Sequence, residues 1–193
     1  MTSETPGWYY AELDPEGTKR YWNGTEWSSD VVGGNTIWPR FGARLIDGVI
    51  NGIVLFIIWW AVFDSNNANT YGITIVSFML VALYEIGFIT LKGATPGKMV
   101  FRLKVVQVSD GSSPPSGSVA AKRYGPSLLS VVPFLGSILY LIVLGLSLYW
   151  LSADPDRQSI FDRSGKTYVA VSYTHLRAHE TRHDLVCRLL LEK

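Results

Sequence analysis

Apolar residues gather in three long runs in the middle of the chain. The runs cover about residues 40–63, 71–91 and 127–151. Each is close to the roughly 20 apolar residues that a helix needs to cross the hydrocarbon core of a bilayer. We therefore predict an all-α integral membrane domain of three or four helical segments over residues 38–171.

The number of segments depends on the third run. Its start contains Pro133-Phe134-Leu135-Gly136, which favours a break between a half-inserted helix and a second span. A single span would leave Asp162 outside, far from Arg44, whereas a hairpin would return Asp162 to the cytoplasmic face. Basic residues beyond the run favour the hairpin: Arg157, Arg163 and Lys166.

A different pattern precedes the first run, where aromatic residues crowd around a turn signal. Asn23-Gly24 separates two aromatic stretches, 19–22 and 25–27, which is typical of a two-residue β-hairpin turn. With Trp8–Tyr10 as a third strand, this predicts a three-stranded β module over residues 1–30, followed by a linker over 31–37. Stacked aromatic rings must supply most of its packing: Trp8, Tyr21, Trp22 and Trp27. A peptide-binding platform and an aromatic core without a ligand both fit this pattern.

The net charge of +1 conceals a strong asymmetry between the loops. The loop over 91–126 holds six basic residues against Asp110 alone, and the loop over 64–70 holds no basic residue. The positive-inside rule then places the 91–126 loop and the N-terminus in the cytoplasm and the 64–70 loop outside. We expect a multi-pass protein of a bacterial plasma membrane.

Charged residues near the inner ends of the first two spans are the candidate site. Arg44 and Asp47 are one helical turn apart, and Glu85 on the returning span should lie at a similar depth. Ionisable groups inside a membrane are costly and usually functional. Together with Asp162, they predict either a cation or proton site or an Arg-acid staple between helices. We also expect Gly48 and Gly52 to allow close helix packing.

The sequence offers no catalytic or metal-binding motif. Gly93–Lys98 does not fit a phosphate-binding loop, because its spacing is one residue short and Met99 follows the lysine where Ser or Thr is needed. Every histidine and the single cysteine fall within residues 172–193: His175, His179, His183 and Cys187. This stretch resembles the translation of a sequencing adapter, and we interpret it as an artefact of sequence assembly. We therefore expect no enzyme activity, no cofactor and no metal.

Three blocks, FGARLIDGVI, ATPGKMVFRLKVV and DRQSIFDRSGKTYVAV, together resemble the RDD family of bacterial membrane proteins over about residues 38–171. The resemblance implies that the family's arginine and two aspartates are Arg44, Asp47 and Asp162. It marks a family-type loop: Thr95, Pro96, Gly97 and Lys98. It also implies a helical membrane domain for which ligand transport has been suggested. Where many members have His-Asp, this chain has Phe161-Asp162. Residues 6–29 resemble a short WW-like domain of unknown function found in actinobacterial membrane proteins.

Two functions follow as hypotheses. In the first, a small transport or ion-coupling protein uses the Arg/Asp/Glu cluster as its binding site. In the second, a non-catalytic adaptor recruits a cytoplasmic protein through the N-terminal module, and the charges only hold the helices together. The bilayer is the expected partner in both. A protein partner of the module and self-association are left open, and we expect no nucleic-acid partner.

Overall fold

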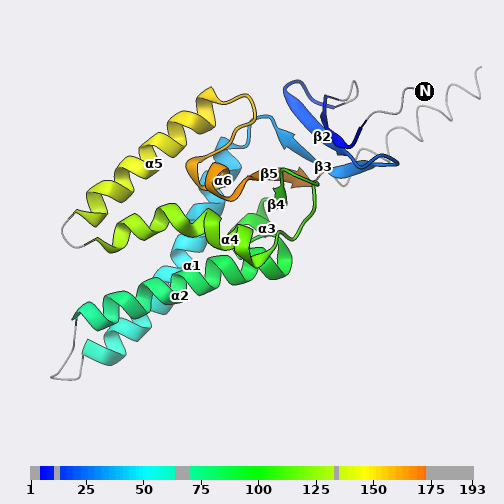
Figure 1. Cartoon of the computed structure of the whole chain (residues 1–193). Coiled ribbons are helices and arrows are strands. Elements are labelled where there is room, and N and C mark those ends of the chain that lie inside the picture. Colours follow the sequence, from blue (N-terminus) through cyan, green and yellow to red (C-terminus); the bar gives the residue numbers. More distant parts are fainter. Residues whose placement is uncertain (1–4, 11–13, 64–69, 133–134, 173–193) are drawn as a thin grey trace, which may run out of the picture.

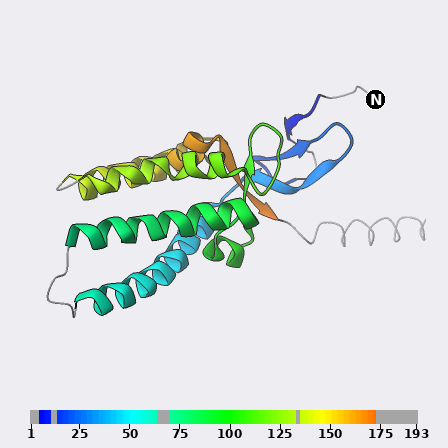
Figure 2. The ribbon, with the colours of Figure 1, turned by 60° about the horizontal axis from the view of Figure 1, so that its bottom comes forward.

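Long helices project from one side of a small β-sheet (Figures 1 and 2). The computed structural model describes residues 5–10, 14–63, 70–132 and 135–172. The elements in chain order are β1 (Gly7–Tyr9), β2 (Thr18–Trp22), β3 (Trp27–Gly33), α1 (Ile37–Phe63), α2 (Thr70–Lys92), α3 (Pro96–Val100), β4 (Leu103–Gln107), α4 (Gly117–Tyr124), the 3-10 helix η1 (Gly125–Val131), α5 (Gly136–Ala153), α6 (Ile160–Gly165) and β5 (Thr167–Ser172). The predicted class, a mostly helical membrane domain with an N-terminal antiparallel sheet, is confirmed.

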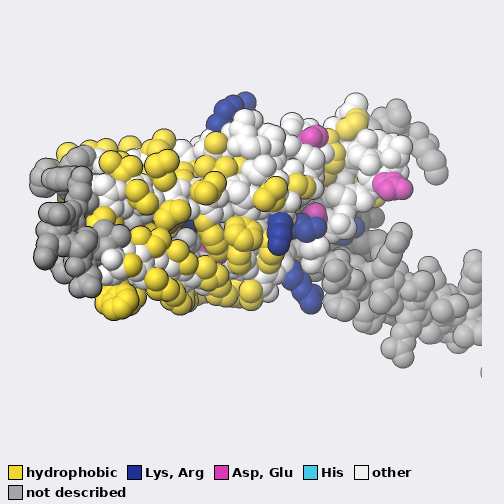
Figure 3. Space-filling view, turned by 90° about the horizontal axis from the view of Figure 1, so that it is seen from below, with side chains coloured by type: hydrophobic (Ala, Val, Ile, Leu, Met, Phe, Trp, Pro, Cys, Tyr) yellow, Lys and Arg dark blue, Asp and Glu magenta, His cyan; other side chains and the backbone are white. Residues whose placement is uncertain are grey.

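Among the described residues, three helices are long and apolar enough to cross a membrane: Ile37–Ala61, Gly72–Lys92 and Gly136–Ala153. Their surfaces agree with this, because large apolar side chains such as Phe56, Trp60 and Leu83 are about 70% exposed. Figure 3 shows apolar side chains spread over the helical part on this face, whereas basic side chains gather near its junction with the sheet. Such a surface suits contact with lipid.

The third apolar run is arranged as a hairpin. The helix η1 ends at Val131, and α5 begins at Gly136 and runs back beside α4 and η1 (Figure 1). The predicted break at Pro133-Phe134 itself lies outside the described residues. The return of α5 brings α6 beside the start of α1, so that Asp162 lies 2.6 Å from Arg40.

The strands form one antiparallel sheet in the order β1-β2-β3-β5-β4. The three predicted N-terminal strands are present, with Trp8 opposite Tyr21. The strand β4 has the alternating pattern of a half-buried strand, with Leu103 and Val105 buried and Lys104 between them facing the other side.

The predicted boundary between the N-terminal module and a linker over 31–37 is wrong. The strand β3 continues to Gly33, and Val31 and Val32 pair with Val171 and Ala170 of β5. Both valines are at most 2% exposed. The N-terminal strands are therefore part of the same sheet as the strands that follow the membrane helices, because burial of these valines needs β5 as a neighbour.

The hairpin turn also differs from the prediction. Trp22 pairs with Trp27, so the loop has four residues rather than two. The side-chain Oδ1 of Asn23 accepts hydrogen bonds from the backbone N–H groups of Thr25 and Glu26, both at 2.7 Å. Asn23 therefore stabilises the turn through its side chain, and Gly24 supplies the positive φ of +101°.

The membrane helices are packed directly onto the sheet. One core cluster joins α1, α2 and α4 to the two strands β4 and β5: Ala43, Ile89, Leu103, Val105, Ala120 and Val169. On the N-terminal side, the indole of Trp8 donates to the Val108 carbonyl at 2.9 Å and packs edge-on against Tyr21 and Tyr168. A change in the helices can therefore be transmitted to the sheet through contiguous side chains.

The predicted close packing at Gly48 and Gly52 is wrong for contacts within the described chain. A Cβ atom added at either glycine would meet no atom within 4 Å. Gly48 instead borders the polar cavity described below.

Burial of β3 against β5 can be tested with a pair of substitutions on one strand. Val32→Ala should lower the free energy of unfolding by about 1–3 kcal/mol, because Val32 is 1% exposed. Ser29→Ala, at an exposed position of β3, should change it by less than about 0.5 kcal/mol. Denaturant titration in detergent micelles measures both. Equal small effects would indicate that residues 31–37 are a linker after all.

Candidate functional site

A polar cavity lies between α1, α2 and the first turns of α5. Its volume is about 240 Å³. Four lining residues follow one face of α1 at helical spacing: Arg44, Asp47, Gly48 and Asn51. The remaining lining residues are Val81, Tyr84 and Glu85 of α2, Thr95 before α3, and Tyr140 of α5.

Asp47 is buried at the base of this cavity and is held by neutral donors. Its Oδ1 accepts from the Tyr84 hydroxyl at 2.9 Å and from the Gly97 backbone N–H at 2.8 Å. Its Oδ2 accepts from the Thr95 hydroxyl at 2.5 Å. Pro96 starts α3 without an N–H group, and the next residue, Gly97, offers an N–H that has no partner within the helix. Asp47 thus ties α3 to α1 and α2.

Glu85 lies between two cationic side chains. Both of its carboxylate oxygens are 3.2–3.3 Å from Arg44 Nη1, and its Oε1 is 3.9 Å from Lys98 Nζ. The sequence predicted that Glu85 lies near the Arg44/Asp47 pair, as the contact with Arg44 shows. It named Lys98 only as part of the family-type loop, which the structure instead forms as the helix α3, and it gave no sign that α3 folds back to bring Lys98 beside Glu85. Burial lowers the pKa of Lys98 to about 8; the charges of Arg123 and Arg44 also lower it, whereas Glu85 opposes the shift.

Arg44 is the accessible member of the cluster. Its side chain is 45% exposed, against 12% for Glu85 and 10% for Lys98. The guanidinium also lies over the ring of Phe161, 5.3 Å from its centroid. Within the part of the chain that the structure describes, only Nη1 of Arg44 donates a hydrogen bond, so Nε and Nη2 are available to a ligand.

Asp162 belongs to a second cluster, which corrects the prediction that it joins Arg44. It is fully buried, and it forms ion pairs with Arg40 and Arg123. A capping box with Ser159 at the start of α6 adds hydrogen bonds of 2.8 and 3.0 Å to its Oδ2. Burial alone would raise the pKa of Asp162, but the two arginines and Ser159 hold that pKa well below its usual range.

The physical reason for this division is the position of α6. It docks at the start of α1, one turn before Arg44, so Asp162 meets Arg40 instead. Arg40 is four residues from Arg44 and thus on the same helix face, which was a signal available in the sequence. No sequence pattern indicates Arg123, because it comes from α4.

The predicted aromatic residues of the N-terminal module face two ways. Trp8 and Tyr21 pack toward Tyr168 in the sheet. Trp22 and Trp27 form a separate pair, with ring centroids 5.1 Å apart, to which Tyr9 adds an edge contact at 6.3 Å. Trp27 is 41% exposed. The first pair is core, and only the second group is open to a partner.

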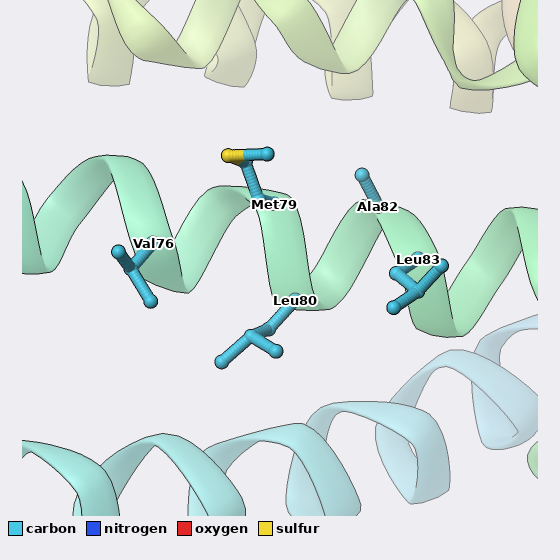
Figure 4. Close-up of a pocket in the computed structure, with 5 residues that line it drawn as sticks. All are labelled: Val76, Met79, Leu80, Ala82 and Leu83. Carbon is cyan, nitrogen blue, oxygen red and sulfur yellow. The ribbon is translucent and has the colours of Figure 1, made fainter.

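A larger hollow of about 550 Å³ lies along the apolar face of α2 (Figure 4). It is lined by Val76, Met79, Leu80, Ala82 and Leu83. These side chains are spaced along one helix and include no polar group, which suits contact with lipid tails. The hollow therefore offers no chemistry comparable to that of the polar cavity.

In the described residues, no three His, Cys, Asp or Glu side chains lie together as a group that could hold a metal ion. The histidines and the cysteine of residues 173–193 lie outside the described part of the chain, so the interpretation of that stretch as an artefact stays a prediction.

Three membrane-length apolar helices, packed around charged clusters at one end, define a multi-pass membrane protein. The chain belongs to the RDD family, which residues 35–166 match. Arg44, Asp47 and the Thr95–Lys98 loop lie within this match, as does Asp162. No curated protein and no solved structure matches the chain. The resemblance of residues 6–29 to a WW-like domain stays a prediction.

Proposed function

We propose that the protein binds a small polar solute or ion in the polar cavity and carries it across a bacterial plasma membrane, without catalysing a chemical reaction. The observation that carries this proposal is the accessible Arg44 at a cavity that Glu85 and Asp47 also line. Charged groups among apolar helices are costly and commonly mark the path of a solute or ion.

The two acidic residues of the cavity suit different roles. Asp47 has hydrogen-bond donors on both oxygens and fastens α3, which makes it a structural residue of the site. Among the described residues, the Glu85 carboxylate contacts charged groups only at the ends of two long side chains, Arg44 and Lys98. A ligand that contacts Arg44 can therefore change the Arg44–Glu85 pairing without dismantling the fold.

Flux measurements on the full chain in proteoliposomes test this proposal. Uptake of sodium, protons, chloride and small carboxylates is measured against empty liposomes. For any probe that the unsubstituted protein transports, Glu85→Gln should reduce the flux at least tenfold, because Arg44 loses its charged partner. The elution volume of this variant on size exclusion in detergent should stay unchanged, which shows that it is folded. Lys104→Gln is the control, since Lys104 pairs loosely with Asp30 on the sheet, at 3.7 Å. Unchanged flux in Glu85→Gln, or no flux above empty liposomes for any probe, would contradict the proposal.

The adaptor alternative is supported by one observation, the aromatic group of Tyr9, Trp22 and Trp27, in which Trp27 is exposed and the other two are partly buried. Aromatic surfaces of this kind are common at protein interfaces. If this group recruits a protein, Trp27→Ala should abolish co-purification of that protein and leave flux unchanged. Trp8→Phe, in the sheet core, should leave co-purification intact.

A further inference from the structure

The two clusters together carry one excess positive charge. Four cationic side chains converge on the junction between the helices and the sheet: Arg40, Arg44, Lys98 and Arg123. Three acidic side chains face them: Asp47, Glu85 and Asp162. In a region of low dielectric constant, an uncompensated charge is costly. The network is therefore balanced either by a bound anion or by the loss of one proton.

The place for an anion is next to Arg44. The Arg44 side chain is 45% exposed, its Nε and Nη2 atoms donate no hydrogen bond within the described residues, and Tyr140 lines the same cavity. A guanidinium binds a carboxylate through two parallel hydrogen bonds, for which its planar geometry is suited. The cavity is less suited to a bound cation, because hydrogen-bond donors already occupy both oxygens of Asp47 and the cationic side chains of Arg44 and Lys98 flank Glu85.

The place for the proton is Lys98. The other three cations are arginines, which stay protonated in proteins. Lys98 is buried in α3, with Glu85 of α2, Arg44 and Asp47 of α1, and Arg123 of α4 as the charged groups around it. Two of its neighbours repel its charge, and Glu85 is shared with Arg44.

We propose that the polar cavity binds a small anion of the size of a short-chain carboxylate, together with a proton carried on Lys98. The inference rests on the proposed function and names the class of its substrate. Because the anion attracts the protonated lysine, each ligand strengthens the binding of the other by the same factor. The anion in the cavity and the proton on Lys98 together carry no net charge, so their joint movement does not work against the membrane potential.

This coupling has a defined pH dependence. The pKa of Lys98 is about 8, so below pH 8 the lysine already carries its proton and anion affinity is constant. Above pH 8, binding must take a proton from solution, and the dissociation constant rises about tenfold per pH unit. A cation site would show the opposite trend, since protons compete with cations.

The test is calorimetric titration of the full chain in nanodiscs with acetate, and with acetamide as its neutral isostere, between pH 6 and 10. Each titration is repeated in two buffers of different ionisation enthalpy, which gives the protons taken up per acetate bound. We expect no uptake at pH 6, uptake approaching one proton at pH 9–10, and no binding of acetamide.

Two substitutions of Lys98 separate the effect of its positive charge on acetate binding from the effect of its exchangeable proton. Lys98→Arg should bind acetate at pH 10 as tightly as at pH 6, with no proton uptake, because arginine keeps its proton. Lys98→Met should bind at least tenfold more weakly at pH 6. Lys104→Met, on the sheet, should behave as the unsubstituted protein. Since Lys98→Arg preserves the charge, the test stands even if Lys98→Met fails to fold.

Three results would overturn the inference: no acetate binding at any pH, equal binding of acetamide, or the same loss of affinity above pH 8 in Lys98→Arg. If any one of these results occurs while Glu85→Gln still abolishes the flux of a cation, the inference fails and the proposed function stands. If no flux depends on the cavity residues, the proposed function fails as well.

Discussion

Asp162→Asn is expected to lower the free energy of unfolding by about 3–5 kcal/mol, the usual cost of removing one partner from a buried ion pair. The substitution leaves Arg40 and Arg123 facing each other without the carboxylate that holds both. It also weakens the capping box at the start of α6. Denaturant titration of the purified protein in detergent micelles gives the change in free energy.

Two further variants show whether the loss of stability comes from the buried charges: one removes a surface ion pair, and the other removes an arginine together with Asp162. Lys104→Gln removes a half-exposed ion pair on the sheet and should cost less than about 1 kcal/mol. The double variant Asp162→Asn/Arg123→Gln should be more stable than Asp162→Asn alone, because one uncompensated charge is gone. A loss below 1 kcal/mol in Asp162→Asn would contradict the role of the cluster as the joint between α1, α4 and α6.

Gly97→Ala is expected to be nearly as damaging, at about 3 kcal/mol. A Cβ atom at this position would lie 2.8 Å from Asp47 Cγ and would also overlap the Ala43 carbonyl oxygen. The helix α3 must then move away from α1, which breaks the hydrogen bonds of Gly97 and Thr95 to Asp47 and displaces Lys98. Unfolding in micelles and acetate binding should both be impaired.

The matched control is Gly52→Ala on α1. No atom lies within 4 Å of a Cβ there, so the substitution should be neutral or should stabilise the helix by up to about 1 kcal/mol. The same Gly→Ala substitution should thus lower the free energy of unfolding at Gly97 and leave it unchanged or raise it at Gly52. Comparable stability of the two variants would show that α3 is not fixed against Asp47.

The sequence predicts local features of this protein well, because they depend on local periodicity. Runs of apolar residues identify the spans, and aromatic stretches around a turn signal identify the first three strands. Helical spacing and the antiparallel order of two spans were enough to place Arg44 beside Glu85, where the structure has an ion pair at 3.2 Å.

The features that could not be predicted depend on contacts between distant segments. The pairing of β3 with β5 turns an expected linker into a buried strand, although residues 31–37 alone give no sign of a partner. The docking of α6 directs Asp162 to Arg40 rather than to Arg44. Lys98 enters the site only because α3 folds back onto α1, which no local pattern encodes.

The position of β5 between β3 and β4 has a consequence for the order of folding. The strand β3 leaves the ribosome before any membrane helix, yet its partner β5 is made only after the last one. Until then β3 presents an open edge, to which other strands can add. Closure of the sheet is therefore a late event, because η1 and α5 must first form the hairpin that brings β5 back to β3. Val31 and Val32 can be buried only in a chain whose last helices have taken this arrangement.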